Sequence, residues 1–179
     1  MNIGTKSVLF GVHAFWVHPV VVAIAWRKYH GKWPQHLTEW VAIFFHDFGY
    51  LGKPNMDGVE GKQHPWGGAH YAEKFLKFFG YGMKEIVPAM FHILGHSRSF
   101  SKQFGFAISP LCAPDKLSIL LEPSWFYFMR AHLSGEIYEF VGMARRFGFK
   151  PTSLRSRWQW LKWYKAKVKH DFKSTQAGQ

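Results

Sequence analysis

The sequence is poor in two kinds of residue, and each scarcity restricts what the protein can be. Only one of its 179 residues is cysteine, Cys112, which excludes an intrachain disulfide and fits a reducing compartment such as the cytoplasm. Acidic residues are also few, because 11 Asp and Glu stand against 23 Lys and Arg, for a net charge of +12. Such an excess favours anionic partners, namely nucleotides, nucleic acid or an acidic membrane surface.

The long apolar stretch near the start, residues 8–26, is interrupted by ionisable groups. It nearly has the length of a membrane span, but it contains His13, His18 and Pro19. It also lacks the small-residue cleavage site of a secretory signal. Two histidines in such a stretch favour a buried helix beside a polar site, because ionisable groups are costly in a bilayer. We therefore expect a cytoplasmic protein.

Strict alternation of apolar and polar residues, which is typical of half-buried strands, is scarce, whereas helical spacing is common. With 47% apolar residues, among them 18 Phe and 9 Trp, the chain can bury the core of one domain. We expect an all-α fold, a compact bundle of about six or seven helices with a site between them. The expected helices cover residues 19–29, 39–45, 66–79, 84–94, 110–121 and 123–140 and part of the tail, whereas 49–61 and 97–106 are expected loops.

The composition changes at about residue 142. Residues 142–179 hold ten Lys and Arg against one acidic residue, Asp171, and so carry nine of the twelve net positive charges. We expect residues 1–141 to form the main domain and residues 142–179 a basic, Trp-rich C-terminal helix docked on it. Basic charge beside Trp is also typical of a membrane-surface helix, and Lys and Arg interleaved with aromatics are typical of nucleic-acid contacts. Segment 155–169 leaves all three interpretations open.

Another apolar run, residues 41–45, ends in the adjacent pair His46 and Asp47. Burying an imidazole and a carboxylate without partners is costly. A divalent metal relieves that cost, since the neutral imidazole offers a nitrogen and the carboxylate an oxygen. An isolated pair would more simply be a solvated helix end, but further His and Asp residues recur downstream.

These residues follow one another in the order H…HD…H…H…D. We assign the positions to His18, His46, Asp47, His64, His96 and Asp115. The order resembles that of the HD-domain superfamily of metal-dependent phosphohydrolases, over about residues 12–122. Three short sequence motifs are similar to those of the family: His46-Asp47-Phe48-Gly49, His64-Pro65-Trp66-Gly67-Gly68-Ala69 and Ala113-Pro114-Asp115-Lys116-Leu117. The chain departs from the family pattern at Pro114, before the last Asp, and at Tyr50, where many relatives have Lys.

The resemblance implies that residues 1–141 form an HD-like metal-binding domain that hydrolyses a nucleotide or related phosphoester with a metal-activated water. One divalent transition metal, among Fe, Mn, Zn, Co and Ni, would be held by His18, His46, Asp47 and Asp115. His64 and His96 would support a second metal, with Asp47 as the bridge. His46, Asp47 and Arg98 are the expected catalytic residues. Basic side chains neutralise charge on phosphate, and the candidates are Lys53, Lys62, Arg98, Lys102 and Lys116.

Neighbouring histidines leave the identity of two of the expected ligands open. His13 is an alternative to His18, which we prefer because its interval of 28 residues to His46 is family-like. His92 shares a helix face with His96, which we prefer for its step to Asp115. His70 is expected to be exposed or to lie outside the ligand set. The loop acids Asp57 and Glu60 are expected to be solvated, the alternative being a general acid or a partner of the ligands.

Two other functions fit the same residues. Some HD-type sites with six ligands hold two irons and oxidise alcohols or phosphonates with dioxygen. A non-enzymatic module that binds nucleic acid or membrane through segment 155–169 is the second alternative. The surplus of aromatic residues also favours a buried interface between copies of the chain.

Overall fold

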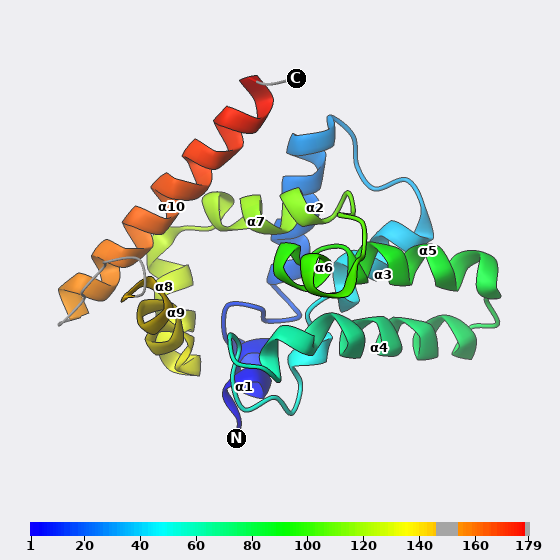
Figure 1. Cartoon of the computed structure of the whole chain (residues 1–179), viewed down its shortest axis with the longest axis horizontal. Helices are drawn as coiled ribbons and strands as arrows, with labels where there is room; N and C mark the ends of the chain where they lie inside the picture. Colours follow the sequence, from blue (N-terminus) through cyan, green and yellow to red (C-terminus); the bar gives the residue numbers. More distant parts are fainter. Residues whose placement is uncertain (146–153, 178–179) are drawn as a thin grey trace.

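The computed structural model describes residues 1–145 and 154–177, which form helices and no strand. Ten α-helices and two short 3-10 helices occur in this part of the chain (Figure 1). Their bounds are α1 (Ile3–Phe10), α2 (His18–His30), α3 (Leu37–Phe45), η1 (Phe48–Tyr50), η2 (Gly61–Gln63), α4 (His64–Phe78), α5 (Met83–Leu94), α6 (Arg98–Phe104), α7 (Cys112–Leu121), α8 (Ser124–Ser134), α9 (Glu136–Arg145) and α10 (Leu154–Ala177). The expected all-α class is confirmed, but the expected number of about six or seven helices was too low.

Three helices account for the difference. The single helix expected over residues 123–140 is broken at Gly135, whose φ of 89° separates α8 from α9. The expected loop 97–106 contains α6, which its polar surface residues concealed but which buries Phe100. The first apolar stretch also divides, since α1 ends before Gly11 and α2 begins at His18.

The core contains two large clusters on either side of α7, and a third, smaller cluster of Val8, Tyr50 and Met56. The larger lies among α2, α3, α4 and α5 and contains Trp26, Ile43 and Leu76. The other joins the end of α7 to α8, α9 and α10, and contains Ile137 and Leu161. Figure 1 shows α7 extending from beside α2 toward α8, so that it connects the two groups of helices.

The basic C-terminal helix packs on the rest of the chain. Helix α10 contacts α7, α8 and α9, and it buries Trp160 and Leu161. The ammonium group of Lys165 donates a hydrogen bond of 2.6 Å to the backbone oxygen of Glu122, just beyond α7. Residues 146–153 of the basic tail and the side chain of Arg155 lie outside the described residues.

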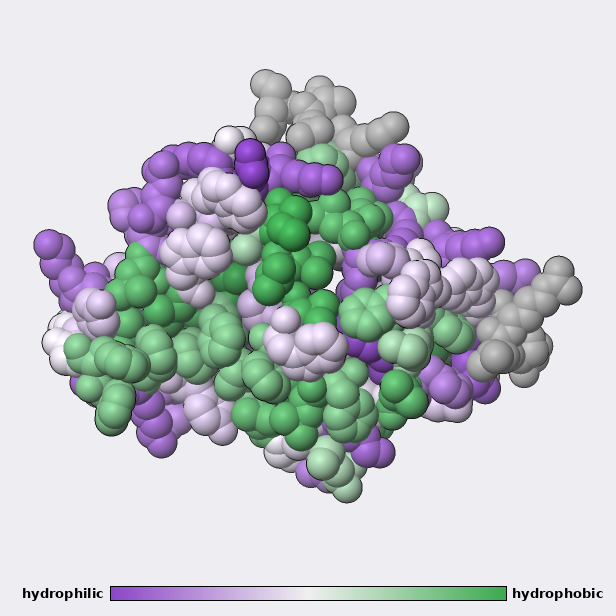
Figure 2. All heavy atoms as spheres, turned by 180° about the vertical axis from the view of Figure 1, so that it is seen from behind, coloured by the Kyte–Doolittle hydropathy of each residue, from purple (hydrophilic) through white to green (hydrophobic). Residues whose placement is uncertain are grey.

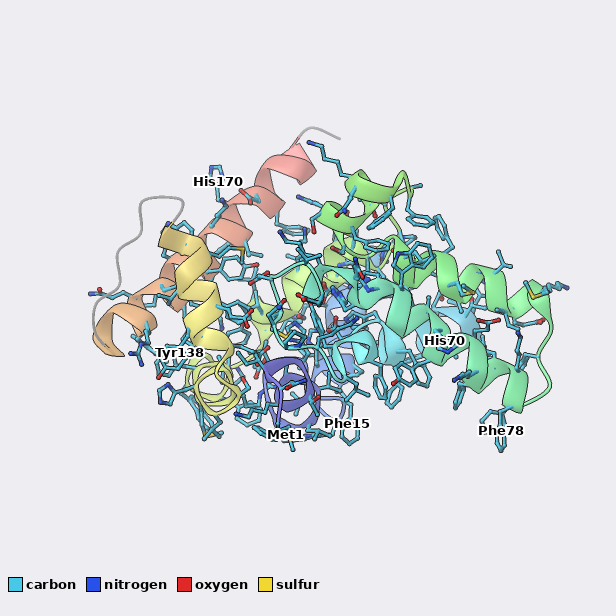
Figure 3. The ribbon with its side chains drawn as sticks, turned by 60° about the horizontal axis from the view of Figure 1, so that its bottom comes forward. Met1, Phe15, His70, Phe78, Tyr138 and His170 are labelled. Carbon is cyan, nitrogen blue, oxygen red and sulfur yellow. The ribbon has the colours of Figure 1, made fainter. Side chains whose placement is uncertain are left out.

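Large apolar side chains also cover much of the molecular surface. Figure 2 shows them gathered over the face opposite to the view of Figure 1. Phe78 at the end of α4 is 84% exposed and projects from the molecule (Figure 3). Within the described residues, no helix combines the length and the apolar character that a bilayer span requires.

Candidate metal centre

The six residues of the H…HD…H…H…D pattern meet at the ends of five helices. His18 and His64 are the first residues of α2 and α4, and Asp115 lies in the first turn of α7. The pair His46 and Asp47 directly follows α3, and His96 follows α5 after one intervening residue. Residues far apart in the chain therefore converge because five helix ends point at one place.

The first group of potential metal ligands contains His18, His46, Asp47 and Asp115. The Nε2 atoms of His18 and His46 lie 3.2 Å apart. Asp47 Oδ2 is 3.1 Å from His18 Nε2 and 3.0 Å from His46 Nε2. Asp115 Oδ1 closes the group at 3.2 Å from His18 Nε2 and 3.4 Å from His46 Nε2. Two imidazole nitrogens and two carboxylate oxygens thus surround one point.

Asp47 also belongs to a second group, with His64 and His96. The Nε2 atoms of these two histidines are 3.0 Å apart. Asp47 Oδ1 lies 3.6 Å from His64 Nε2 and 3.8 Å from His96 Nε2. Asp47 therefore turns one oxygen to each group, which is the arrangement of a carboxylate that bridges two ions.

Hydrogen bonds fix how three of these imidazoles face the centre. The Nδ1 atoms of His46, His64 and His96 each lie within hydrogen-bond distance of the carbonyl oxygen three residues earlier, at 2.9, 2.9 and 2.5 Å. A carbonyl can only accept, so each Nδ1 carries a proton, and the Nε2 atom of each ring faces the centre and offers a lone pair whenever that ring is neutral. Nitrogen lone pairs that face one another at 3.0 Å need a cation between them. The donor set therefore fits divalent metal ions, and such backbone partners are typical of metal-bound histidines.

One buried oxygen supports the same conclusion. Asp47 Oδ2 is buried, and what faces it within 3.1 Å are the Nε2 atoms of His18 and His46, neither of which is aligned as a hydrogen-bond donor to it. A buried carboxylate oxygen without a partner costs free energy, which a bound cation removes.

The charges within the two groups differ. His46 is buried, which alone would lower its pKa, but the carboxylates of Asp47 and Asp115 raise that pKa well above its ordinary value. Burial lowers the pKa of His64 to about 3, and the adjacent His96 contributes to that decrease. Burial, with the nearby His46, likewise lowers the pKa of His96. Without metal, the first group therefore holds a proton on His46, and the second consists of neutral imidazoles.

Two glycines of these sequence motifs, Gly49 and Gly68, allow the helix ends to approach one another closely. A Cβ on Gly49 would collide with the backbone oxygen of His64. A Cβ on Gly68 would lie 2.6 Å from the oxygen of Phe45 and 2.7 Å from that of His46. Real Cβ atoms do not approach oxygen so closely, so glycine at both positions lets α4 pack directly against the segment that carries His46 and Asp47.

Pro114 does not displace the last ligand. It lies in the first turn of α7, where a helix lacks an internal partner for the backbone N–H. The backbone N–H of Asp115 still donates a 3.0 Å hydrogen bond to the oxygen of Leu111. The helix therefore continues through Pro114, and Asp115 reaches the centre.

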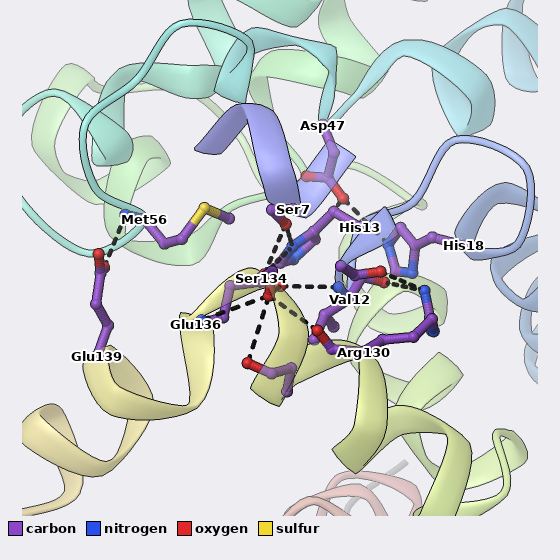
Figure 4. A network of polar contacts seen from close by, with 12 residues as sticks. Ser7, Val12, His13, His18, Asp47, Met56, Arg130, Ser134, Glu136 and Glu139 are labelled. Atoms are coloured by element: carbon purple, nitrogen blue, oxygen red, sulfur yellow. Dashed lines mark hydrogen bonds and ion pairs between the residues drawn. The ribbon is translucent and has the colours of Figure 1, made fainter. Parts of the chain in front are cut away.

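His13 lies beside the two ligand groups but is held by other residues. Its Nδ1 atom is 2.8 Å from Ser7 Oγ and 3.0 Å from Glu136 Oε1 (Figure 4). Its Nε2 atom is 4.0 Å from Asp47 Oδ2. Burial opposes protonation of His13, but Asp47 and Glu136 raise its pKa to about 9. His13 therefore adds a positive charge beside Asp47 and stands outside both ligand groups.

Two buried acidic residues that support this region were not found by sequence reasoning. Glu136 accepts hydrogen bonds from the backbone N–H of Val12, at 2.8 Å, and from Ser7 Oγ, at 2.6 Å. Glu122 pairs with the buried guanidinium of Arg130, which also donates to the oxygen of Val12 at 3.1 Å. These contacts fix the turn between α1 and α2 (Figure 4). Glu136 and Arg130 reach partners in this turn that lie more than a hundred residues away, so no local pattern could reveal these contacts.

The remaining candidates are placed as follows. His92 lies on α5 against Trp26 and belongs to neither ligand group. His70 lies on α4 with its side chain exposed to solvent (Figure 3), and its Nδ1 atom is 3.8 Å from Glu73 Oε2. Glu60 is exposed and accepts a hydrogen bond from Asn55.

Asp57 differs from the solvated acid that its loop position predicts. It is partly buried, it faces the cavity described below, and its Oδ2 atom has no hydrogen-bond partner among the described residues. Burial raises the pKa of Asp57, and the nearby Glu139 contributes to the increase.

A cavity of about 510 Å³ opens over the two ligand groups. This volume suits a small organic ligand. Arg98 and Lys116 line it, whereas Lys53, Lys62 and Lys102 are absent from its described lining. Its opposite wall consists of α9 and α10 and includes Phe140 and Trp160. The centre is therefore accessible to a ligand, with positive and aromatic groups around it.

Comparisons with protein-family models, with curated proteins and with solved structures give no match. The chemical interpretation of the centre therefore depends on its own residues and on the resemblance of the sequence motifs to the HD superfamily.

Proposed function

We propose that this protein is a metal-dependent phosphohydrolase of the HD type, which hydrolyses a nucleotide or related phosphoester in the cytoplasm. The observation that supports it best is the pair of ligand groups joined by Asp47 on the floor of a cavity with a basic rim. Two divalent ions held in this way supply a nucleophilic water at neutral pH and Lewis acidity toward a phosphoryl oxygen.

The side chains around the centre have distinct roles in this proposal. His18, His46 and Asp115 would hold one ion, His64 and His96 would hold the other, and Asp47 would contribute to both. The Nδ1 hydrogen bonds orient His46, His64 and His96, so that their Nε2 atoms remain directed at the centre.

The cations at the rim bind the substrate. Arg98 and Lys116 lie on the wall of the cavity above the metal groups and neutralise negative charge on the bound phosphoester. Lys62 interacts electrostatically with Asp57 on the cavity wall and acts at longer range. Lys53 and Lys102 remain predictions without a contact to the cavity.

The first experiment measures metal content by mass spectrometry and phosphate release from a panel of nucleotides and simple phosphoesters. We expect up to two equivalents of a transition metal in the wild type, and their loss together with activity in the double variant His46→Ala, Asp47→Ala. His70→Ala is the matched control, because it removes an exposed histidine outside both ligand groups, and it should change neither quantity.

Two results would contradict the proposal. Absence of bound metal after reconstitution would leave the buried donors without a function. Bound iron with dioxygen consumption and no phosphate release would instead identify an HD-type oxygenase, which the same ligand set supports.

A further inference from the structure

A second cavity, of about 250 Å³, adjoins the one above the metal centre. Most of its described lining comes from α7 and α10, with Tyr29 of α2 completing one side. Four residues line both cavities: Arg98, Lys116, Tyr164 and Lys167. The cavities are therefore neighbouring compartments, and these four residues form the junction between them.

Three of the four junction residues are cations, and they come from three different helices. Arg98 begins α6, Lys116 lies in α7 and Lys167 in α10. Arg98 and Lys116 are close enough to repel one another, and Lys116 is partly buried. Convergence of like charges at a partly buried position is unfavourable unless an anion lies between them.

One carboxylate in this second cavity, called the outer cavity below, partly offsets the positive charge of the junction. Asp171 lines the outer cavity and attracts Lys116, but its side chain is 56% exposed. Asp115 also attracts Lys116 but faces the metal centre. By formal charge the three cations exceed Asp171, so the junction is positive overall on the side of the second cavity.

Beyond the junction the outer cavity is mainly apolar and aromatic. Its wall includes Leu117, Val168 and Phe172. The ring of Phe172 lies 5.7 Å from that of Tyr29, centroid to centroid. An extended ligand would thus meet metals, then cations, then an apolar compartment.

We propose that the junction of Arg98, Lys116 and Lys167 is a subsite for a second phosphate group of the substrate. This inference rests on the proposed phosphohydrolase function and specifies its substrate class: a phosphoester that carries another phosphate beside an apolar or aromatic portion. A phosphate bears about two negative charges near neutral pH and accepts several charge-assisted hydrogen bonds, which suits three convergent cations. Helix α10 is then a wall of the substrate site.

The test is the affinity of the full-length, metal-free protein for inorganic pyrophosphate, measured by isothermal titration calorimetry. Lys167→Met removes a junction cation at an exposed position of α10, so the fold should remain intact. We expect binding about tenfold weaker than in the wild type, the effect of losing one hydrogen bond to a charged group. Lys116→Met should weaken it similarly, and Asp171→Asn should strengthen it several-fold by removing the competing carboxylate.

Lys162→Met is the matched control. Lys162 is exposed on the same helix and is absent from the described lining of both cavities, but its substitution changes the net charge equally. Equal losses of affinity in Lys162→Met and Lys167→Met would show non-specific attraction and overturn the subsite. Because no metal is present, the result stands whether or not the protein hydrolyses phosphoesters.

Discussion

At the scale of residues, the centre combines two kinds of histidine. His46 lies beside the carboxylates of Asp47 and Asp115, whereas His64 and His96 are buried and face one another. The carboxylates raise the pKa of His46, and burial lowers the pKa of the other two. An ion that binds the first group must therefore displace a proton from His46, whereas an ion that binds the second group meets neutral imidazoles.

We predict that metal binding releases protons from the first group and none from the histidines of the second. His46 is protonated in the metal-free protein below its raised pKa, so each proton that the metal displaces makes affinity fall about tenfold per unit decrease in pH. Calorimetry with Mn²⁺ in two buffers of different ionisation enthalpy counts the protons. Release of no proton by the protein at pH 6 would contradict the charge assigned to His46.

The members of the two potential ligand groups could be selected from the sequence, because their order and their flanking motifs resemble those of a known superfamily. The choice between His13 and His18 shows where that approach ends. Both histidines lie beside Asp47, and their ring centroids are 5.3 Å apart. What distinguishes them is Glu136, which lies 123 residues from His13 and holds it away from the ligand groups. Burial and long-range pairing of this kind leave no periodic signal in the sequence.

At the scale of elements, the arrangement of the candidate metal centre depends on where helices begin and end. It also depends on the close packing of α4 against the segment that carries His46 and Asp47. The helical periodicity predicted most helices, but it could not show where Gly135 breaks a helix or that the polar segment 97–106 contains one. The motifs that contain Gly49 and Gly68 were recognised only by their resemblance to the family. The structure explains why glycine is required at these positions. Gly68 lies where a side chain would press on the backbone that precedes Asp47.

We predict that Gly68→Ala destabilises the protein by about 1–3 kcal/mol, because the added methyl group forces the backbone of Phe45 and His46 away from α4. The same displacement moves His46 and Asp47, so metal affinity should fall as well. Thermal unfolding and metal titration measure the two effects.

Gly142→Ala provides the comparison, since Gly142 also lies within a helix but its Cβ would meet no atom within 4 Å. Alanine is the better helix former there, and stability should rise by up to about 1 kcal/mol. Equal effects of the two substitutions would refute the close packing as the reason for Gly68.

At the scale of the whole molecule, the centre links parts of the chain that are distant in sequence. Its first and last ligands, His18 and Asp115, are 97 residues apart and approach to 3.2 Å. The five helices that supply the ligands include those of the larger core cluster and α7, which also contacts the C-terminal helix. Bound metal would therefore cross-link most of the fold.

We predict that metal removal lowers the unfolding temperature substantially. A ligand at a hundred times its dissociation constant stabilises the native state by about 2.7 kcal/mol. For a chain of this size that corresponds to roughly 5–10 °C. Differential scanning calorimetry with and without a chelator measures the shift, and the His46→Ala, Asp47→Ala variant should show none. A chelator effect of equal size in that variant would place the metal elsewhere.

The position of α10 in the chain also affects the order in which the site is made during synthesis. All six candidate ligands precede it, so the wall that it provides, with Trp160 and Lys167, is translated after them. A ribosome-bound chain can thus present a complete set of metal donors before the substrate cavity has its final side. Under the proposed function, an ion could therefore enter the centre before the last wall of the cavity is in place.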